Sequence, residues 1–270
     1  MLLPAYNGGS PNECFPQAEA AARKALALDD NSADAHAALG VVKSIYDFDF
    51  AGSIPEYDRA IQLNPNDATA HHWLANDSLS ALGRSENEIA EMKRALELDP
   101  LSLIINSNLG AAYIHARRFD EAIAQLRKTV ELDGGFYFAR YNLGLALELK
   151  GSISEAVAEY QRAIALNDDP LPLALLGQLY ARIGRSDEAR QILEQLRERR
   201  RQRYVQAYCL AVVNLGLGDH NEAINWLEEG YRERDGFGMG TIRIDPLLDS
   251  LRGDPRFEAL AEKVVPHGAK

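Results

Sequence analysis

Two asparagines, Asn108 and Asn142, stand at the same point of successive copies of one sequence pattern, each directly before a Leu-Gly pair. A carboxamide has two donor hydrogens and an acceptor oxygen, so two of them in register can hold the backbone of an extended peptide without reading its side chains. The pair therefore favours binding of a peptide through hydrogen bonds, and not catalysis. The alternative, that both asparagines cap their helices or face solvent, stays open, because a polar side chain on a helix needs no ligand.

Other reactive residue types do not combine into a site. The six histidines lack metal-ligand spacing, and the adjacent His71 and His72 point to different sides of a helix, so they cannot easily share a metal. Residues 236–240, Gly-Phe-Gly-Met-Gly, lack the preceding strand and the spaced acidic residue of a dinucleotide-binding loop. Cys209 lies in an apolar helical run and is expected to be buried. We therefore expect no catalytic residue, no metal and no cofactor.

The dense basic cluster of the chain covers residues 197–203. It falls at the carboxyl end of a predicted helix, where positive charge complements the helix macrodipole. A local site for an acidic protein segment is the alternative interpretation of such a charge run.

The charge balance and the cysteines limit the partners and the compartment. A net charge of −11 opposes a nucleic-acid partner, which requires clustered Lys and Arg. No stretch approaches the roughly 20 apolar residues of a membrane span, and residues 1–6 lack the features of a signal peptide. Cys14 and Cys209 lie at opposite ends of the chain, and an array of repeats would keep distant repeats apart in space, so no disulfide is expected between them. These observations favour a cytoplasmic protein without nucleic-acid or membrane partners.

The elements that would position the asparagines recur along the chain. A small residue returns at separations of 35, 35, 34, 33 and 34, at Gly40, Ala75, Gly110, Gly144, Gly177 and Ala211. A second small residue returns at Ala122, Ala156, Ala189 and Ala223. Small side chains are needed where two helix axes cross, and the apolar residues around them keep the helical spacing of three and four. The unit is a helix, a turn, a second helix and a loop, and its repetition predicts a solenoid whose purpose is its surface.

The boundaries of these helices have their own signals. The second helices are predicted to end at Asn64, Asp99, Asp133 and Asn167. Ser152 with Glu155, and Asp219 with Glu222, have capping-box spacing, and Ser85 with Glu88 offers a further capping box.

The repeated Leu-Gly, Tyr, Gly, Glu-Ala, aromatic or Leu, Ala and Asp-Pro pattern resembles the tetratricopeptide repeat over roughly residues 15–235. The resemblance implies an all-α fold, a right-handed superhelical α-solenoid of helix-turn-helix repeats. We expect a partial repeat over residues 1–32, six repeats over 33–235, and a linker with C-terminal capping helices over 236–270. Asp245-Pro246 and Asp254-Pro255 each place Asp at a helix N-cap and Pro at the first helical position, which predicts two short helices covering the last repeat.

The resemblance also implies that the first helix of each repeat lines a concave groove. The lining residues that it implies are His72, Asn76, Ile104, Ser107, Asn108, Ala111, Phe138, Tyr141, Asn142, Leu145 and Gln178. A protein or peptide would bind there through contacts of the asparagines with its backbone and an aromatic pocket near Phe138 and Tyr141. The asparagine pair is similar to the asparagine ladder of glycosyltransferase-associated repeats. A clamp for a peptide carboxyl terminus is disfavoured, because His72, Phe138 and Asn142 occupy the positions of the expected cations.

Two alternatives remain open. Residues 17–28 match only the second helix of a repeat, and such a half repeat exposes apolar surface, which favours a homodimer through this end or a piece of a longer protein. Residues 46–50 and 71–73, with the C-terminal ending, resemble the repeat region of bacterial multidomain signalling proteins. There the repeats usually follow a winged-helix, kinase or nucleotide-cyclase domain, so this resemblance implies a regulatory arm whose partner domain lies outside this chain.

Overall fold

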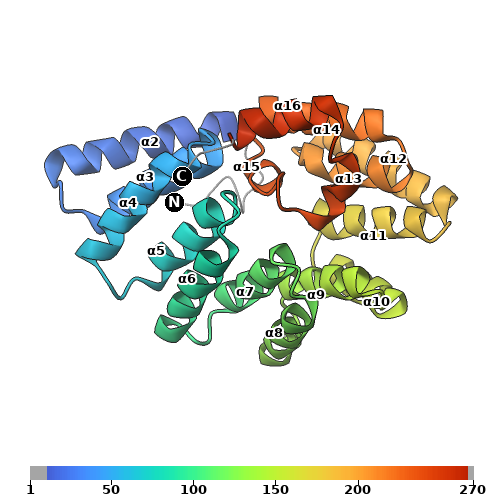
Figure 1. The fold of residues 1–270 in the computed structure, drawn as a ribbon, viewed down its shortest axis with the longest axis horizontal. Coiled ribbons are helices and arrows are strands. Elements are labelled where there is room, and N and C mark those ends of the chain that lie inside the picture. The colour runs from blue at the N-terminus through green and yellow to red at the C-terminus, as the bar shows by residue number, and fades with distance from the viewer. Residues whose placement is uncertain (1–10, 267–270) are drawn as a thin grey trace. The chain divides into compact units, whose positions relative to one another are not determined.

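The structure, a computed structural model, describes residues 11–266, and every regular element in this range is a helix (Figure 1). The predicted all-α class is confirmed. The part of the predicted half repeat before residue 11 lies outside the described residues.

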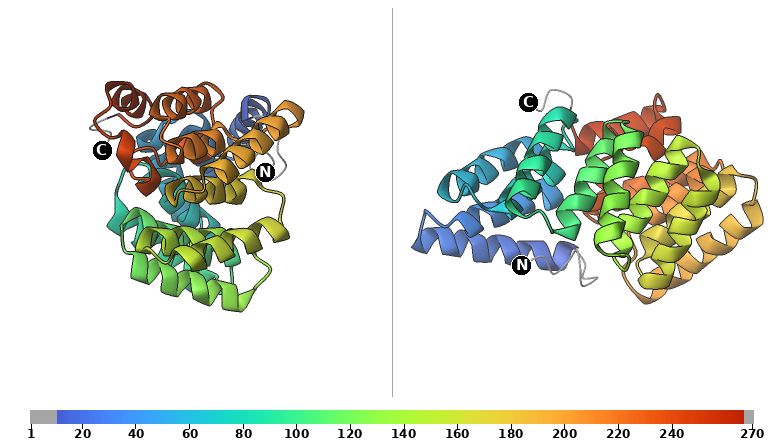
Figure 2. Two further views of the ribbon diagram at one scale, coloured as in Figure 1. Left: turned by 90° about the vertical axis from the view of Figure 1, so that its right-hand side faces the viewer. Right: turned by 90° about the horizontal axis from the view of Figure 1, so that it is seen from below.

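The helices follow one another in pairs, each made of a first helix and a second helix. α2 (Pro11–Leu28) precedes the pairs. The pairs are α3 (Ala33–Val41) with α4 (Phe50–Leu63), α5 (Ala68–Trp73) with α6 (Ser85–Leu98), α7 (Leu103–His115) with α8 (Phe119–Leu132), α9 (Tyr137–Lys150) with α10 (Ile153–Leu166), α11 (Pro170–Arg182) with α12 (Ser186–Gln202), and α13 (Ala207–Gly216) with α14 (His220–Arg232). The pairs α7 with α8 and α9 with α10 lie stacked side by side (Figure 2).

Two first helices end in a π-helical segment. η1 (Val42–Tyr46) continues α3, and η2 (Leu74–Leu79) continues α5. A π-helical turn holds more residues than an α-helical turn, and such turns occur frequently at functional sites. The extra residue agrees with the longer separation of 35 that the small residues show in these two repeats.

The contacts divide the chain into two compact units. Unit 1 contains the described residues up to Pro100, the segment Gly230–Ile244, and the residues from Glu258 onward. Unit 2 contains Leu101–Glu229 and Asp245–Phe257. Each unit therefore combines a block of repeats with a piece of the C-terminal segment.

The small residues lie where the helices of a pair cross, as predicted. A Cβ atom added to Gly110 would lie 2.5 Å from Cγ of Leu126, and one added to Gly144 would lie 2.8 Å from ring carbons of Tyr160. The alanines at the second small position, Ala122, Ala156, Ala189 and Ala223, are fully buried. Close approach of the two backbones is therefore built into each of these pairs.

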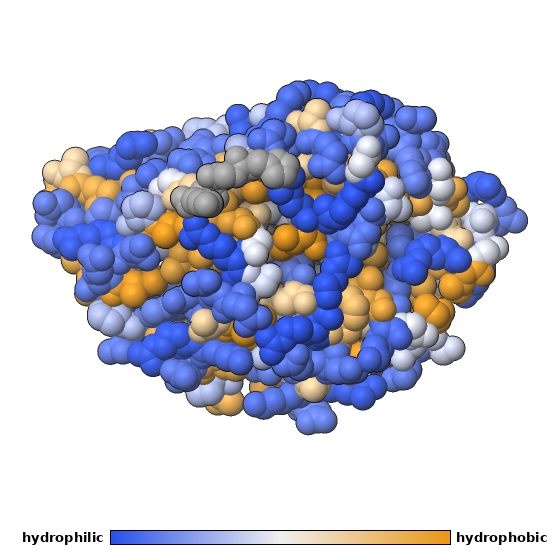
Figure 3. Space-filling model, in the orientation of Figure 1, coloured by the Kyte–Doolittle hydropathy of each residue, from blue (hydrophilic) through white to orange (hydrophobic). Residues whose placement is uncertain are grey.

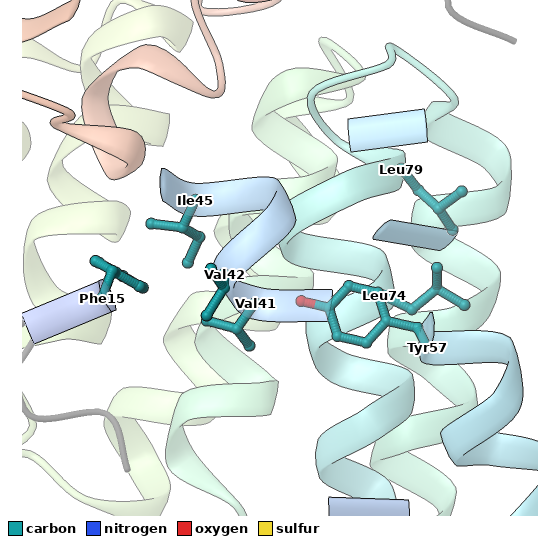
Figure 4. Packing of buried hydrophobic residues seen from close by; sticks show 7 residues of the cluster. All are labelled: Phe15, Val41, Val42, Ile45, Tyr57, Leu74 and Leu79. Carbon is teal, nitrogen blue, oxygen red and sulfur yellow. The ribbon is translucent and has the colours of Figure 1, made fainter. Parts of the chain in front are cut away.

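The core of unit 1 collects side chains from α2, α3, η1, α4 and η2. Figure 4 shows its members, Phe15, Val41, Val42, Ile45, Tyr57, Leu74 and Leu79. The ring of Phe15 stacks on Tyr46 with 5.4 Å between the ring centroids. The half repeat α2 is thus tied to the first complete pair, whereas its last residue, Leu28, is exposed. Self-association through this half repeat stays a prediction.

The helix ends follow the sequence signals with two exceptions. Asn64, Asp99, Asp133 and Asn167 are the C-caps of the second helices, as predicted. Asp219 accepts a hydrogen bond of 3.0 Å from the backbone N–H of Glu222, which is the bond that a cap at Asp219 requires. The capping boxes at Ser152 and Ser85 are wrong: Ser152 makes no side-chain cap bond, and α6 already includes Ser85. The first N–H groups of a helix can bond to water, so these ends do not require a side-chain cap.

The C-terminal segment forms α15 (Gly236–Met239), the 3₁₀ helix η3 (Pro246–Leu251) and α16 (Pro255–Val264). Asp245 accepts from the backbone N–H of Leu247, and Asp254 accepts from that of Arg256, each at 2.8 Å, so the two Asp-Pro pairs start helices as predicted. η3 packs against α13 in unit 2, and α15 packs against η1 in unit 1. A Cβ on Gly236 would lie 2.1 Å from the carbonyl oxygen of Ile45, so this approach requires glycine.

Candidate functional site

Four first helices of unit 2 form a continuous surface. α7 contacts α9, α9 contacts α11, and α11 contacts α13. We call these four helices the first-helix wall. Nine of the sequence-predicted lining residues, from Ile104 to Gln178, belong to it.

The stripe on α7 consists of Ile104, Ser107, Asn108 and Ala111, which share one helix face because they are spaced by three and four. Ile104 and Ala111 are half-buried, whereas Ser107 and Asn108 are buried. The Ser107 hydroxyl has no hydrogen-bond partner in the described part of the chain. The outer members of the stripe are therefore accessible, and the inner two form its floor.

The stripe on α9 carries a cluster of aromatic rings. The rings of Phe138 and Tyr141 meet edge to face, with 4.9 Å between centroids. Phe136 lies 6.1 Å from Phe138, and Tyr137 lies 6.2 Å from Tyr141, so four rings form what we call the aromatic cluster. Tyr141 is buried, whereas the other three rings and Leu145 are half-buried. The sequence analysis identified two of the four rings and missed Phe136 and Tyr137.

A hydrogen bond fixes the aromatic cluster to the next first helix. The Tyr137 hydroxyl donates to Oδ2 of Asp169 at 3.1 Å, while Oδ1 of Asp169 caps α11 by accepting from the backbone N–H of Leu171. The cluster is thereby held at the start of both α9 and α11. A rigid aromatic surface binds at low entropic cost, because its side chains are already ordered.

The two asparagines in register, Asn108 and Asn142, lie in the floor of the wall. Asn108 and Asn142 are each 6 % exposed. The Asn142 side chain donates a 2.9 Å hydrogen bond to the carbonyl oxygen of Phe138 in its own helix. Asn142 therefore already uses a donor within α9, and a bond from the asparagine pair to a bound peptide stays a prediction.

Gln178 belongs to a buried polar network. It bonds to the carboxylate of Glu148, which also accepts from the Tyr160 hydroxyl at 2.9 Å and from Arg182 at 2.6 Å. Burial raises the pKa of Glu148, and the three donors oppose this shift by stabilising the charged form. The network ties α9, α10 and α11 together, so Gln178 supports the wall from inside. The Glu148 network was missed because its partners lie far apart in the sequence.

The remaining lining residues, His72 and Asn76, belong to unit 1. His72 is buried, and this desolvation lowers its pKa to about 4. Asn76 is half-buried in η2 and donates to Asp77 at 2.9 Å. Their role in binding stays a prediction.

The turn between the helices of a pair holds a residue pattern that the sequence analysis missed. Four of these turns place a glycine at positive φ, at Gly83, Gly151, Gly184 and Gly218. The same position in the other two pairs holds Phe48 and Arg117, each at φ 60°. A residue with a Cβ atom rarely adopts this conformation, so these two residues are unusual. Aligning the turns of the repeats would have found both.

The other candidate residues of the sequence have ordinary structural partners. In the basic cluster, Arg199 and Arg203 pair with Asp168, each at 2.7 Å. Both cysteines are free thiols, and Cys209 is buried as predicted. Residues 11–266 contain no group of His, Cys, Asp and Glu arranged to hold a metal ion. None of the helices in that range is long and apolar enough to cross a membrane.

The arrangement defines a class of protein, one built from stacked helical hairpins. Models of the tetratricopeptide repeat match residues 76–136, 107–170 and 147–209. The chain is therefore a tetratricopeptide repeat protein, and proteins of this class typically mediate protein–protein interactions and are generally non-catalytic. No curated protein matches the sequence at a significant level.

Solved structures support the fold assignment. The chain is similar to a thermophilic tetratricopeptide repeat protein of Thermus thermophilus, with 23 % identity and a TM-score of 0.56 over 61 % of this chain and 89 % of that chain. It is similar to PilF of Pseudomonas aeruginosa, with 19 % identity and a TM-score of 0.54 over 77 % of this chain and 94 % of that chain. The chain is also similar to the Cut9–Hcn1 hetero-tetramer of the APC/C, with 16 % identity and a TM-score of 0.62 over 93 % of this chain and 46 % of that chain.

Proposed function

We propose that this chain is a non-catalytic scaffold that binds an extended segment of a protein partner on the first-helix wall of unit 2. The aromatic cluster is the centre of the proposed site, and Ile104, Ala111 and Leu145 are its accessible flanks. Asn108 and Asn142 are proposed to contact the backbone of the bound segment.

The observation that supports this proposal most is the half-buried state of Phe136, Tyr137 and Phe138 around the buried Tyr141. Aromatic rings dominate the energetics of protein interfaces, especially where they are rigid and partly desolvated before binding. On the face shown in Figure 3, hydrophobic areas alternate with hydrophilic ones. An ordered group of four aromatic rings therefore supports the wall as the proposed place for a partner.

The proposal is tested with peptides selected from a displayed random library on the purified chain. The affinity of the selected peptides is then measured by calorimetry for the wild type, Phe138→Ala and Tyr141→Ala. Losing a central aromatic residue costs on the order of 1 to 2 kcal/mol of binding, which weakens Kd by roughly 5- to 30-fold.

Lys128→Ala is the matched control, since Lys128 is exposed on the second helix α8, away from the wall residues. Its affinity is expected to equal that of the wild type. Thermal melts by circular dichroism verify that both aromatic variants are folded. Selected peptides that bind both folded aromatic variants as tightly as the wild type would contradict the proposal.

A further inference from the structure

The 3₁₀ helix η3 packs against α13, the last helix of the first-helix wall, and two of its carboxylates hold it in place. Tyr208, on α13, donates to Oδ2 of Asp245 at 2.5 Å. Arg117, directly after α7, donates to both carboxylate oxygens of Asp249, at 2.6 and 2.8 Å. A bidentate pair of this kind adds geometric specificity to the attraction of opposite charges.

The contacts of η3 with Tyr208 and Arg117 extend beyond the last helix pair, which is all that a cap of the solenoid would need to cover. α7 and α13 are the first and the last of the four first helices in unit 2. A segment that only covered the end of the solenoid would need to contact the last pair, α13 with α14. The contact with Arg117 instead connects η3 to the opposite end of the wall.

The leucines of η3 face the protein. Leu247, Leu248 and Leu251 are 7, 0 and 1 % exposed, while Asp249 and Ser250 are exposed. The segment thus presents apolar side chains inward and has two carboxylates four residues apart, Asp245 just before the helix and Asp249 within it. This is how a short helical segment docks on a partner surface through spaced anchors.

Arg117 holds Asp249 from a backbone conformation that favours glycine. Its φ of 60° occurs in the turn position where four other pairs have glycine. Strained residues of this kind persist where the surrounding structure compensates for them, and they cluster at ligand clamps and switches. A glycine at this position would relieve the backbone but would lack the Arg117 side chain, which binds Asp249.

The corresponding exception in unit 1 follows the same rule. Phe48 also has φ 60°, and its ring stacks on Tyr231 with 5.6 Å between centroids. The guanidinium of Arg234 lies 5.4 Å from the centre of the same ring. Tyr231 lies near the end of α14 and Arg234 lies just after it, and both belong to the part of unit 1 that covers Gly230–Ile244. In each unit, a turn without glycine therefore contacts a part of the chain beyond residue 229.

We propose that η3 is an internal ligand of the first-helix wall, and that the partner of this wall carries a short acidic segment with leucines, which binds in place of η3. This inference rests on the proposed function, and it names the chemistry of the partner. Arg117 and the Tyr208 hydroxyl select carboxylates spaced four residues apart. The leucine positions select apolar side chains between the two carboxylates and two residues after the second one.

The build of η3 permits its release. It is a six-residue 3₁₀ helix closed by hydrogen bonds of 3.2 Å from Leu248 to Asp245 and from Arg252 to Asp249. Such helices are short because their hydrogen-bond geometry is poor. Turn residues 241–244 precede it, and Gly253 at φ 87° follows it. η3 can therefore detach without disrupting a longer helix, because it is not continuous with one.

The test adds a fluorescent peptide with the sequence of Ile244–Arg252 to the full chain and measures binding by anisotropy. Three proteins are compared: the wild type, the variant Asp245→Asn/Asp249→Asn, and that variant with Arg117→Gly added. Glycine suits the turn, as it does in four other pairs, so Arg117→Gly removes the side chain without straining the backbone.

The attached η3 competes at an effective concentration of about millimolar, so the wild type is expected to bind the peptide weakly. Weakening η3 by Asp245→Asn/Asp249→Asn is expected to tighten peptide binding at least about tenfold, and adding Arg117→Gly is expected to abolish that gain. A control peptide with both aspartates replaced by asparagine is expected to bind weakly to all three proteins. Peptide binding that stays weak in the first variant, or that is unaffected by Arg117→Gly, would overturn the proposal and make η3 a fixed cap.

Hydrogen exchange on the wild type keeps the proposal testable if a variant does not fold. Release of η3 predicts that the amides of Leu248 and Arg252 exchange much faster than those within α13. Equal protection of η3 and α13 would show that η3 leaves only on unfolding, and would also overturn the proposal.

The same reagents separate this inference from the proposed function. Library peptides that depend on Phe138 but do not compete with the Ile244–Arg252 peptide would leave the proposed function standing and this inference wrong. Arg117-dependent binding of the Ile244–Arg252 peptide, with no library peptide sensitive to Phe138 or Tyr141, would give the reverse result.

Discussion

The hydroxyl of Tyr57, on α4, donates a hydrogen bond of 3.1 Å to Oδ2 of Asp77, in η2, and both side chains are buried. Asn76 donates to the other carboxylate oxygen at 2.9 Å. Burial nevertheless raises the pKa of Asp77 to about 6, because the two donors compensate only part of the lost hydration. The pKa of Tyr57 is raised well above its usual value, so its hydroxyl remains a donor.

Asp77 is expected to reduce the stability of the protein at neutral pH. Its pKa is about 6 in the folded protein and 3.8 in a free side chain, so between these values the unfolded chain ionises first. The resulting cost develops as pH rises from about 4 and is complete above about 6, where it amounts to about 3 kcal/mol. Asp77→Asn removes it, so the free energy of unfolding of the variant, minus that of the wild type, should rise by about 3 kcal/mol from pH 4 to pH 7.

Urea unfolding of both proteins at a series of pH values measures this difference. A fixed offset from the altered hydrogen bonds does not matter, because only the change with pH is diagnostic. A difference between the two proteins that is independent of pH would show that Asp77 titrates normally.

His72 in the same repeat is expected to act in the opposite direction. Burial lowers its pKa from 6.5 to about 4, so as pH falls through this range the unfolded chain takes up the proton first. The wild type should therefore lose about 3 kcal/mol of stability from this residue between pH 7 and pH 4. His72→Gln removes the loss, and the stability difference from the wild type should become more favourable at low pH.

The two variants control for each other. Asp77→Asn and His72→Gln change the same buried region, but their stability differences should have opposite slopes with pH. Equal slopes in the same direction would show a general effect of disturbing this region, and would refute both assignments.

The fold was predictable because its signals are local and repeated. Gly110 and Gly144 recur at equivalent points of successive repeats, and each marks a crossing that the structure contains. The π-helical segments η1 and η2 were visible only as an extra residue between small positions. The sequence does not state where an extra residue is absorbed, so their form required coordinates.

The candidate site was predictable only in part. The resemblance to the tetratricopeptide repeat placed Ile104, Ala111 and Phe138 in the lining of the groove, and the structure leaves them half-buried. Spacing cannot tell that Asn142 bonds to its own helix or that Gln178 bonds to Glu148, because packing of neighbouring helices decides both.

The partner of Arg117 was beyond the reach of sequence reasoning for a related reason. Asp249 lies 132 residues further along the chain, and no periodicity connects the two. A local signal does exist, since Arg117 stands where most repeats have glycine. Such an exception indicates a constraint without identifying its partner.

Gly110 and Leu126 provide a test of the packing that defines each helix pair. The methyl group of Gly110→Ala would lie 2.5 Å from Cγ of Leu126, which is fully buried and cannot move aside freely. Overpacking of this kind costs about 1 to 3 kcal/mol of the free energy of unfolding. Leu126→Ala alone creates a cavity and should cost about 2 to 5 kcal/mol.

The double variant Gly110→Ala/Leu126→Ala should be destabilised by less than the sum of the single variants, by at least about 1 kcal/mol, because the new methyl group occupies space that the leucine vacates. Gly134→Ala is the matched control, since Gly134 is exposed and the nearest atom to its added Cβ is the guanidinium end of Arg140 at 3.2 Å, and its effect should stay within about 0.5 kcal/mol. Denaturant unfolding of all four variants gives the comparison. Strict additivity of the two single changes would mean that α7 and α8 separate to accommodate the methyl group, and that the small residue does not set their distance.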